Sequence, residues 1–209
     1  LSLRTACKTY MRSLKKHYPG ESLPLYASKA NSSLAICALI ASEGFGLDAV
    51  SEGELLTALK GGLNGEKIVF HGNNKSHDEL NFAYKNNVTI VLDNHHDIEL
   101  LKKIASEKKQ AKLMLRFTPG IECHTHEYIR TGHLDSKFGF DPDEIEDILV
   151  KLKKIKSIKL TGLHAHIGSQ IFELKPHKDL VGVMTDVLEK ARKMGHPIND
   201  LNVGGGLGI

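Results

Sequence analysis

A lysine, two histidines and a run of glycines are the residues of this sequence that could do chemistry together. Lys29 follows the short apolar run Leu23–Ala27, which reads as a strand. Burying an ammonium group is costly unless it is paired or loses its proton. A lysine that gives up its charge is what Schiff-base chemistry requires. The alternative is a lysine that extends past the strand end into solvent, and the residues alone leave both interpretations open.

The glycine run lies near the end of the chain and reads Gly204-Gly205-Gly206-Leu207-Gly208. Consecutive glycines let the backbone approach an anion closely and direct N–H groups at it. The spacing and the position in the chain differ from those of a dinucleotide-binding fingerprint. The run therefore indicates either a phosphate-binding loop or a flexible turn.

His164 and His166 lie two residues apart on a predicted strand, so we expect both side chains on one side of the sheet. They could be core histidines with satisfied hydrogen bonds, two metal ligands, or a ring packed against a flat cofactor. A metal site needs at least a third ligand, and none can be assigned. The histidines His124, His126 and His133 read as loop residues, so we predict no metal site.

These residues are set in an alternation of short apolar runs with longer stretches of helical periodicity. The predicted strands are 23–27, 46–50, 67–72, 89–93, 112–117, 159–168 and 201–204. The predicted helices are 3–14, 34–43, 52–60, 78–86, 98–108, 141–154 and 178–194. Such alternation predicts parallel βαβ units, either in an open doubly wound sheet or in a closed barrel.

Polar or glycine residues recur where the predicted strands end, and this pattern favours the barrel. A barrel collects its active site from the C-terminal ends of many strands, whereas an open sheet concentrates its site at one switch point. A complete (β/α)8 barrel has eight strands in about 250 residues. The sequence thus predicts an α/β chain in which residues 1–209 form one barrel domain, truncated before the last strand.

Bulk composition excludes several other classes of protein. With 28 basic and 25 acidic residues the net charge is +3, which gives no reason to propose nucleic acid as a partner. No apolar run approaches the ~20 residues that cross a bilayer, and no secretory signal is evident. The odd count of cysteines (Cys7, Cys37 and Cys123) suits a reducing compartment. A cytoplasmic location is therefore expected.

The chemistry-bearing segments also occur together, and in this order, in a known family. Those segments are Tyr26–Asn31, Phe70–Lys75, Leu163–Gln170 and Gly204–Gly208. They resemble successive motifs of the fold-type III, alanine racemase-like decarboxylases that depend on pyridoxal 5'-phosphate. The segment Thr125–Phe140 resembles members that act on meso-2,6-diaminopimelate more than it resembles their ornithine and arginine relatives.

The resemblance implies roles for individual residues around that cofactor. Lys29 would bind the cofactor covalently, and His166 would stack on its pyridine ring as a second catalytic residue. Ser169 and the glycines Gly204, Gly205 and Gly206 would hold its phosphate.

Four further residues are implied to support that site. Asp48, which would bind the cofactor, and Glu54 match a motif near the lysine and would orient Lys29 and His166. A compatible interpretation is a helix-capping arrangement of Glu54 with Ser51. Asn73 and Arg116 end predicted strands and would lie behind the direct contacts.

The activity implied by the resemblance is that of a carboxy-lyase. It would convert meso-2,6-diaminopimelate to L-lysine and CO2, the last step of lysine biosynthesis, as a homodimer. A β-rich second domain with the family's catalytic cysteine is not found in this sequence, so the chain alone is expected to be inactive. The alternatives are a decarboxylase of arginine, ornithine or carboxynorspermidine, a non-catalytic pyridoxal phosphate-binding barrel, and a metal-dependent hydrolase that uses His164 and His166.

Overall fold

A computed structural model describes residues 2–121 and 137–208. Its helices are α1 (Leu3–His17), α2 (Leu34–Ser42), α3 (Glu52–Lys60), α4 (His77–Lys85), α5 (His95–Ile104), α6 (Ile145–Lys153) and α7 (Leu174–Lys193). Its strands are β1 (Leu25–Ala27), β2 (Gly46–Ala49), β3 (Ile68–Phe70), β4 (Thr89–Leu92), β5 (Ala111–Arg116), β6 (Ile158–His164) and β7 (Asp200–Asn202). Strands and helices thus alternate along the described chain, as predicted.

The chain divides into two compact units. The first unit extends to His71 and includes Lys75–Ile90, and the second contains Gly72–Asn74 and the chain from Val91 onward. Strand β4 crosses this boundary. Within each unit, consecutive strands of the chain are neighbours in the sheet and run parallel. Parallel neighbours place their C-terminal ends at one edge, which is where the residues predicted to be functional lie.

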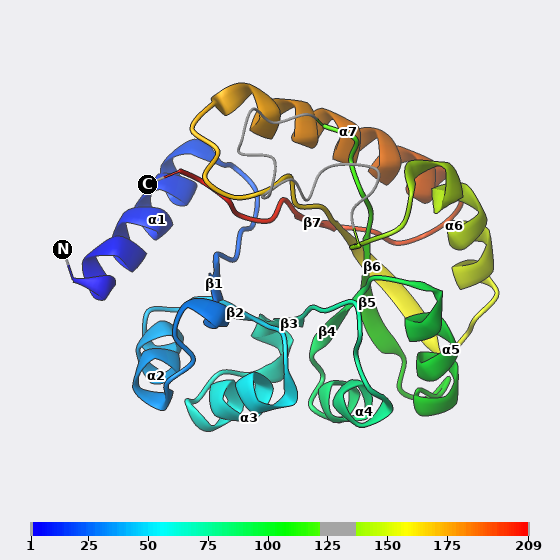
Figure 1. Cartoon of the computed structure of the whole chain (residues 1–209), viewed down its shortest axis with the longest axis horizontal. Coiled ribbons are helices and arrows are strands. Elements are labelled where there is room, and N and C mark those ends of the chain that lie inside the picture. The colour runs from blue at the N-terminus through cyan, green and yellow to red at the C-terminus, as the bar shows by residue number, and fades with distance from the viewer. Residues whose placement is uncertain (1, 122–136, 209) are drawn as a thin grey trace. The chain divides into compact units, whose positions relative to one another are not determined.

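In the first unit, helices α2, α3 and α4 lie side by side next to strands β1–β4 (Figure 1). Two of these helices begin at serines whose side chains accept the backbone N–H of the third helical residue: Ser51 caps α3 and Ser76 caps α4. Strand β3 is buried along its whole length, and the fully buried Leu55 of α3 belongs to the same core. Burial of these apolar faces, rather than helix propensity, holds such short helices in place.

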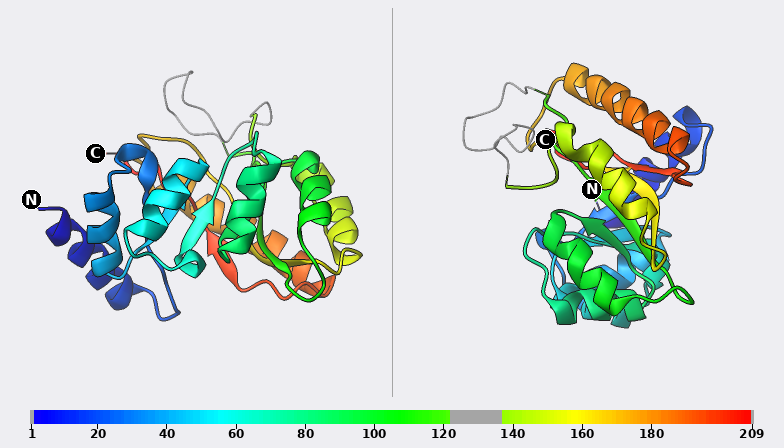
Figure 2. Two further views of the ribbon diagram at one scale, coloured as in Figure 1. Left: turned by 90° about the horizontal axis from the view of Figure 1, so that it is seen from below. Right: turned by 90° about the vertical axis from the view of Figure 1, so that its right-hand side faces the viewer.

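In the second unit, β5 and β6 form the longest pairing, from Ala111 opposite Ile158 to Arg116 opposite His164. Helices α6 and α7 lie next to each other (Figure 2), and Lys190 of α7 pairs with Glu146 of α6 at 3.1 Å. Alternate residues of β6 are buried at its start and the strand is continuously buried at its end. A strand of this kind positions its C-terminal residues rigidly.

All seven predicted strands are confirmed, with differences at their ends. Strand β6 ends at His164, so His166 lies beyond the strand, and the prediction that both histidines share a strand is wrong. Helix α7 begins at Leu174, four residues earlier than predicted, because Pro176 is tolerated in the first turn of a helix. Helix α5 begins at His95 and ends at Ile104, which shifts it towards the N-terminus of the predicted stretch.

Cys7 and Cys37 are buried, and burial raises the pKa of both thiols. Neither is therefore suited to be the reactive thiolate of a catalytic site. Cys123, the histidines His124, His126 and His133, and most of the diagnostic segment Thr125–Phe140 lie outside the described residues. Within the described part of the chain, no helix is both long and apolar enough to cross a bilayer.

A buried histidine in the connection between α7 and β7 predicts a pH dependence of stability. His196 Nε2 donates a hydrogen bond to the Leu149 carbonyl at 2.9 Å, and burial lowers the pKa of His196. Because the unfolded chain then binds the proton more tightly, the free energy of unfolding should fall as the pH drops below about 6.5. Urea unfolding between pH 5 and pH 8 checks this.

Since the chain has 12 histidines, the contribution of His196 must be isolated by a difference between proteins. The variant His196→Gln retains a donor but does not titrate in this range. It should show a shallower decline of stability on acidification than the unsubstituted protein. An identical decline in both proteins would assign the pH dependence to other groups.

Candidate active site

The lysine predicted to bind the cofactor lies in a 3-10 turn, Ser28–Ala30, directly after β1. Lys29 is exposed, whereas Ser28 is only 1% exposed. The argument from the cost of a buried ammonium therefore does not apply to Lys29, because the strand ends before it and the turn carries its side chain outward. The amine is accessible to a reagent from solvent.

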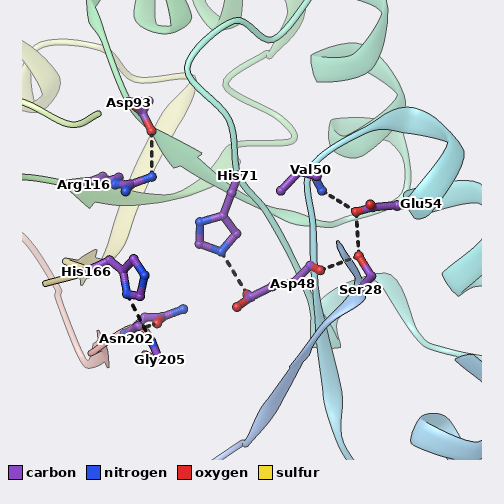
Figure 3. A network of polar contacts seen from close by, with 11 residues as sticks. Ser28, Asp48, Val50, Glu54, His71, Asp93, Arg116, His166, Asn202 and Gly205 are labelled. Atoms are coloured by element: carbon purple, nitrogen blue, oxygen red, sulfur yellow. Dashed lines mark hydrogen bonds and ion pairs between the residues drawn. The ribbon is translucent and has the colours of Figure 1, made fainter. Parts of the chain in front are cut away.

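The turn is tied to its neighbours by the side chain of Ser28 (Figure 3). Its Oγ lies 2.7 Å from the Asp48 carbonyl oxygen and 2.6 Å from Glu54 Oε2. A hydroxyl has one proton, so it donates to one of these two oxygens at a time or shares the proton between them. Glu54 Oε2 also accepts the backbone N–H of Val50 at 2.8 Å. The ends of β1 and β2 and the first turn of α3 are thus joined by one carboxylate.

The same carboxylate explains how both interpretations of the motif around Ser51 fit the structure. Ser51 Oγ accepts the backbone N–H of Glu54 at 3.3 Å, which is the expected helix cap. In a capping box the Glu54 side chain would accept the backbone N–H of Ser51. Here it accepts the N–H of Val50, one residue earlier, and the hydroxyl of Ser28. Glu54 is therefore placed beside the lysine turn, while its part in orienting Lys29 stays a prediction.

Asp48, predicted to bind the cofactor, points its carboxylate at a histidine. Its Oδ1 lies 2.9 Å from Nε2 of His71, which follows β3 and is 9% exposed (Figure 3). Since a carboxylate only accepts, Nε2 of His71 carries the proton in this contact. The imidazole of His71 is thereby held in a fixed orientation, a contact that the sequence did not indicate.

In the second unit, the glycine run forms hydrogen bonds within the protein. The backbone N–H of Gly204 donates to Asn202 Oδ1 at 2.9 Å, and that of Gly205 donates to His166 Nδ1 at 3.3 Å. Gly204 and Gly206 have positive φ angles of 67° and 93°, which favour glycine. The predicted stacking histidine and the predicted phosphate loop are therefore in direct contact (Figure 3).

Ser169 belongs to a segment that runs beside the glycine run. Ile171 N donates to the Gly206 carbonyl at 2.9 Å, and Gly208 N donates to the Ile171 carbonyl at 3.0 Å. A Cβ on Gly206 would lie 1.9 Å from the Gly168 carbonyl oxygen. Two segments predicted separately from the sequence are thus side by side. Whether Ser169 contacts a phosphate stays a prediction.

The side chains of Arg116 and Asn73 both have partners within the protein. Arg116 Nη1 pairs with Asp93 Oδ2 at 3.3 Å, both side chains are buried, and the guanidinium carbon lies 4.4 Å from the Phe138 ring centroid. Burial lowers the pKa of Arg116, and the Asp93 carboxylate opposes this shift. Asn73 Nδ2 donates to the Lys137 carbonyl at 3.0 Å.

Together these residues fasten the segment Lys137–Gly139. Asp93 Oδ1 accepts the Gly139 N–H at 2.7 Å, and Thr118 Oγ1 donates to the Phe138 carbonyl at 3.1 Å. Gly139 has a φ of 78°. Arg116 and Asn73 therefore bond to other protein groups in this structure, and their place behind the direct contacts to a cofactor stays a prediction.

The hydroxyl of Thr118 offers a conservative test of this fastening. Thr118→Val keeps the shape but leaves the half-buried Phe138 carbonyl without this donor. The free energy of unfolding should fall by about 1 kcal/mol. Urea unfolding measures it, and Thr57→Val, which removes an exposed hydroxyl from α3, is the control. A loss no larger than that of the control would show that the bond contributes nothing.

The residues fit a phosphate-bearing aldehyde cofactor. Lys29 offers an exposed amine, and a Cβ on Gly205 would meet no atom within 4 Å, so an anion can approach this backbone closely. The buried Asn202 Nδ2, beside the glycine run, has no hydrogen-bond partner in the described part of the chain. Among residues 2–121 and 137–208, no three His, Cys, Asp or Glu side chains gather as metal ligands.

Comparison with known proteins defines the class to which the fold and these residues belong. The sequence profile of the pyridoxal-binding domain of pyridoxal-dependent decarboxylases matches residues 4–209. The chain therefore belongs to this family of pyridoxal-dependent decarboxylases, as the ordered motifs predicted, and its domain is the one that binds pyridoxal phosphate.

Two curated relatives of high sequence identity are diaminopimelate decarboxylases. The chain is 52% identical to the diaminopimelate decarboxylase of Synechocystis, over all of this chain and 46% of that protein. It is 43% identical to the enzyme of the same name from Bacillus subtilis, over 88% of this chain and 43% of that protein. The chain thus spans about half the length of the curated relatives it matches.

Solved structures agree with the sequence comparison. The diaminopimelate decarboxylase of Helicobacter pylori, determined in complex with L-lysine, matches with a TM-score of 0.90 and 32% identity. The match covers 99% of this chain and 53% of that one. An arginine decarboxylase of Paramecium bursaria Chlorella virus, 21% identical with a TM-score of 0.81, shares the fold. The predicted truncated β/α barrel class is confirmed.

Three residues of the two networks were missed from the sequence. Ser28 had been read only as part of the lysine motif, Asp93 as the end of the predicted strand 89–93, and Asn202 only as part of the predicted strand 201–204. An asparagine two residues before a glycine commonly accepts the backbone N–H of that glycine, so Asn202 carried a usable signal. The partners of Ser28 and Asp93 lie 20 or more residues away in the sequence, and no local pattern reveals such pairs.

Proposed function

We propose that this chain is the cofactor-binding part of a diaminopimelate decarboxylase, a carboxy-lyase that converts meso-2,6-diaminopimelate to L-lysine and CO2. The observation that carries the proposal is the 52% identity with a diaminopimelate decarboxylase in a match that covers the entire chain. The Helicobacter pylori relative, determined with L-lysine bound, supports the same product. The reaction would complete lysine biosynthesis.

In this proposal each unit contributes its own residues. In the first unit, the Lys29 amine would bind the cofactor covalently, and Glu54 and Asp48 hold the surrounding strand ends. In the second unit, Ser169 and the glycine run would hold the phosphate, and His166 would present its ring to the cofactor. When bound, pyridoxal phosphate supplies the electron sink for the loss of the carboxyl group.

The protein's own contribution is orientation and control of protons. The Gly205 N–H donates to Nδ1 of His166, which fixes this nitrogen as the acceptor and fixes the plane of the ring. The His71 ring is likewise held by the Asp48 carboxylate. Such preset groups avoid the entropy cost of ordering side chains when the substrate arrives.

The proposal extends to parts that this sequence does not contain. A β-rich domain would follow the barrel domain of residues 1–209 and supply the catalytic cysteine and much of the substrate site. The full protein would work as a homodimer in the cytoplasm, with an amino acid as its small-molecule substrate and no nucleic acid or membrane as partner. Size-exclusion chromatography with light scattering on the full-length gene product tests the dimer.

Turnover of candidate amino acids by the full-length gene product tests the substrate. CO2 release from meso-2,6-diaminopimelate, arginine, ornithine and carboxynorspermidine should be compared side by side, with pyridoxal phosphate present. Diaminopimelate should give kcat/KM values at least about 100-fold above the others, because a site that binds the second carboxylate of diaminopimelate rejects substrates that lack this group. A preference for arginine or ornithine would show that this amino acid, and not diaminopimelate, is the substrate. A protein that binds the cofactor and turns over none of the four would be a non-catalytic carrier.

A further inference from the structure

We propose that Ser28 is a positioning residue for Lys29: its buried hydroxyl, bonded to Glu54 and to the Asp48 carbonyl, sets the direction of the lysine amine. The proposal rests on the proposed role of Lys29 as the covalent attachment point of the cofactor. Ser28 precedes Lys29 in the 3-10 turn and is 1% exposed, whereas Lys29 is exposed. The Ser28 side chain is therefore fixed inside the protein, while the Lys29 side chain is exposed to solvent.

Apart from the contacts of Ser28 and the pairing of β1 with β2, few hydrogen bonds hold the turn in the described part of the chain. Strand β1 has three residues, all only half-buried, and the residue that precedes the turn, Ala27, offers no side-chain cap. Tyr26 adds one tie, since its hydroxyl donates to the Asn31 carbonyl at 3.2 Å. The Ser28 hydroxyl instead reaches to β2 and to the first turn of α3.

The chemistry of the contact suits positioning. A hydrogen bond to a carboxylate is stronger and more directional than one between neutral groups. Glu54 is itself fixed, because its Oε2 accepts the Val50 N–H while its backbone N–H is capped by Ser51. The hydroxyl thus joins the lysine turn to a carboxylate that cannot easily follow a displaced turn.

Presenting the amine in one direction matters for a bond-forming step. A lysine side chain has many rotamers, and freedom of its backbone turn multiplies the number of unproductive orientations. Small displacements of a reacting group reduce rates steeply. Losing the anchor should slow the capture of pyridoxal phosphate by Lys29 about fivefold, which is the order expected for one hydrogen bond.

Ser28→Thr and Ser28→Val form a matched pair for the test. Both add the same bulk at Cβ, and only threonine keeps the hydroxyl. In the full-length gene product, pyridoxal phosphate is added to cofactor-free protein, the reaction is stopped with borohydride at timed intervals, and the modified Lys29 peptide is quantified by mass spectrometry. Thermal unfolding of each variant is recorded alongside.

The expected result is that Ser28→Val slows the modification of Lys29 about fivefold, while Ser28→Thr stays within about twofold of the unsubstituted protein. The two variants should melt at similar temperatures. Equal capture rates for the Thr and Val variants would overturn the proposal, because position 28 would then respond to volume or to nothing. No modification of Lys29 in the unsubstituted protein would instead overturn the proposed function.

A second variant covers the case in which the substitutions at position 28 do not fold. Glu54→Gln keeps the size of the side chain and removes the charge that Ser28 binds. It should slow capture by a similar factor, because the acceptor of the Ser28 hydroxyl then carries no charge, and unchanged capture by Glu54→Gln would contradict the proposal. Where Ser28→Val folds, combining it with Glu54→Gln should cause little further loss, because both weaken the same contact. Additive losses in the double variant would show that Ser28 and Glu54 act separately and would contradict the proposal.

Discussion

Replacing Lys29 with alanine should abolish covalent capture of pyridoxal phosphate and lower decarboxylation by the full-length protein at least about 10³-fold. Lys29 lies exposed in a turn at the C-terminal end of β1, so a soluble aldehyde can reach its amine. Borohydride reduction followed by peptide mass spectrometry measures capture, and CO2 release measures turnover. Lys29→Arg should fail equally, because a guanidinium keeps the charge but does not form the bond.

Lys16→Ala is the matched control for this experiment. Lys16 is an exposed lysine in the last turn of α1, and its removal should leave the label on Lys29 and the rate unchanged. Label on another lysine in a folded sample of the unsubstituted protein would contradict the assignment of Lys29. So would a Lys29→Ala protein that keeps its full rate.

Two neighbouring glycines should respond in opposite ways to alanine. Gly206 has a φ of 93°, and its Cβ would lie 1.9 Å from the Gly168 carbonyl oxygen. Gly206→Ala must therefore strain the turn or separate the glycine run from the segment that contains Gly168 and Ser169, and should lower the free energy of unfolding by about 2–4 kcal/mol. At Gly205 the added Cβ would meet nothing within 4 Å, so its stability should change by less than about 0.5 kcal/mol.

Cofactor affinity, unlike stability, should be sensitive to the substitution at Gly205. If an anion approaches the open backbone at Gly205, a methyl group there should weaken binding about tenfold while leaving the fold intact. Urea unfolding and titration with pyridoxal phosphate measure the two properties on the same proteins. A Gly205→Ala protein with unchanged cofactor affinity would place the phosphate elsewhere, and an undisturbed Gly206→Ala protein would contradict the tight packing of the two segments.

Much of the fold could be predicted because each element carries its own local signal. Strands such as β3 and β4 are continuous apolar runs, and α3 begins at a serine with a glutamate three residues later. Element ends were less certain. His166 reads as strand by alternation, yet β6 and its parallel pairing with β7 end at His164, opposite Asn202.

The candidate site could be predicted as a set of residues but not as a set of contacts. The sequence indicated Lys29 and the glycine run by residue type, and the family resemblance added Glu54 and Asp48. It did not reveal that Lys29 is exposed while Ser28 is buried, because the direction of a turn depends on tertiary packing. Nor did it show that Arg116 is paired with Asp93, which comes from another strand 23 residues away.

The backbone N–H groups of Gly204 and Gly205 already donate to Asn202 and His166, so these two side chains compete with an anion for the same donors. A phosphate that takes either N–H must displace an acceptor already present, so it gains only the difference between two hydrogen bonds. The affinity for the anion is then lower than that of a loop whose N–H groups have no partner. Release of the anion is easier, because the amides return to acceptors that are already in place. Cofactor retention would rest more on the covalent bond to lysine than on the phosphate loop.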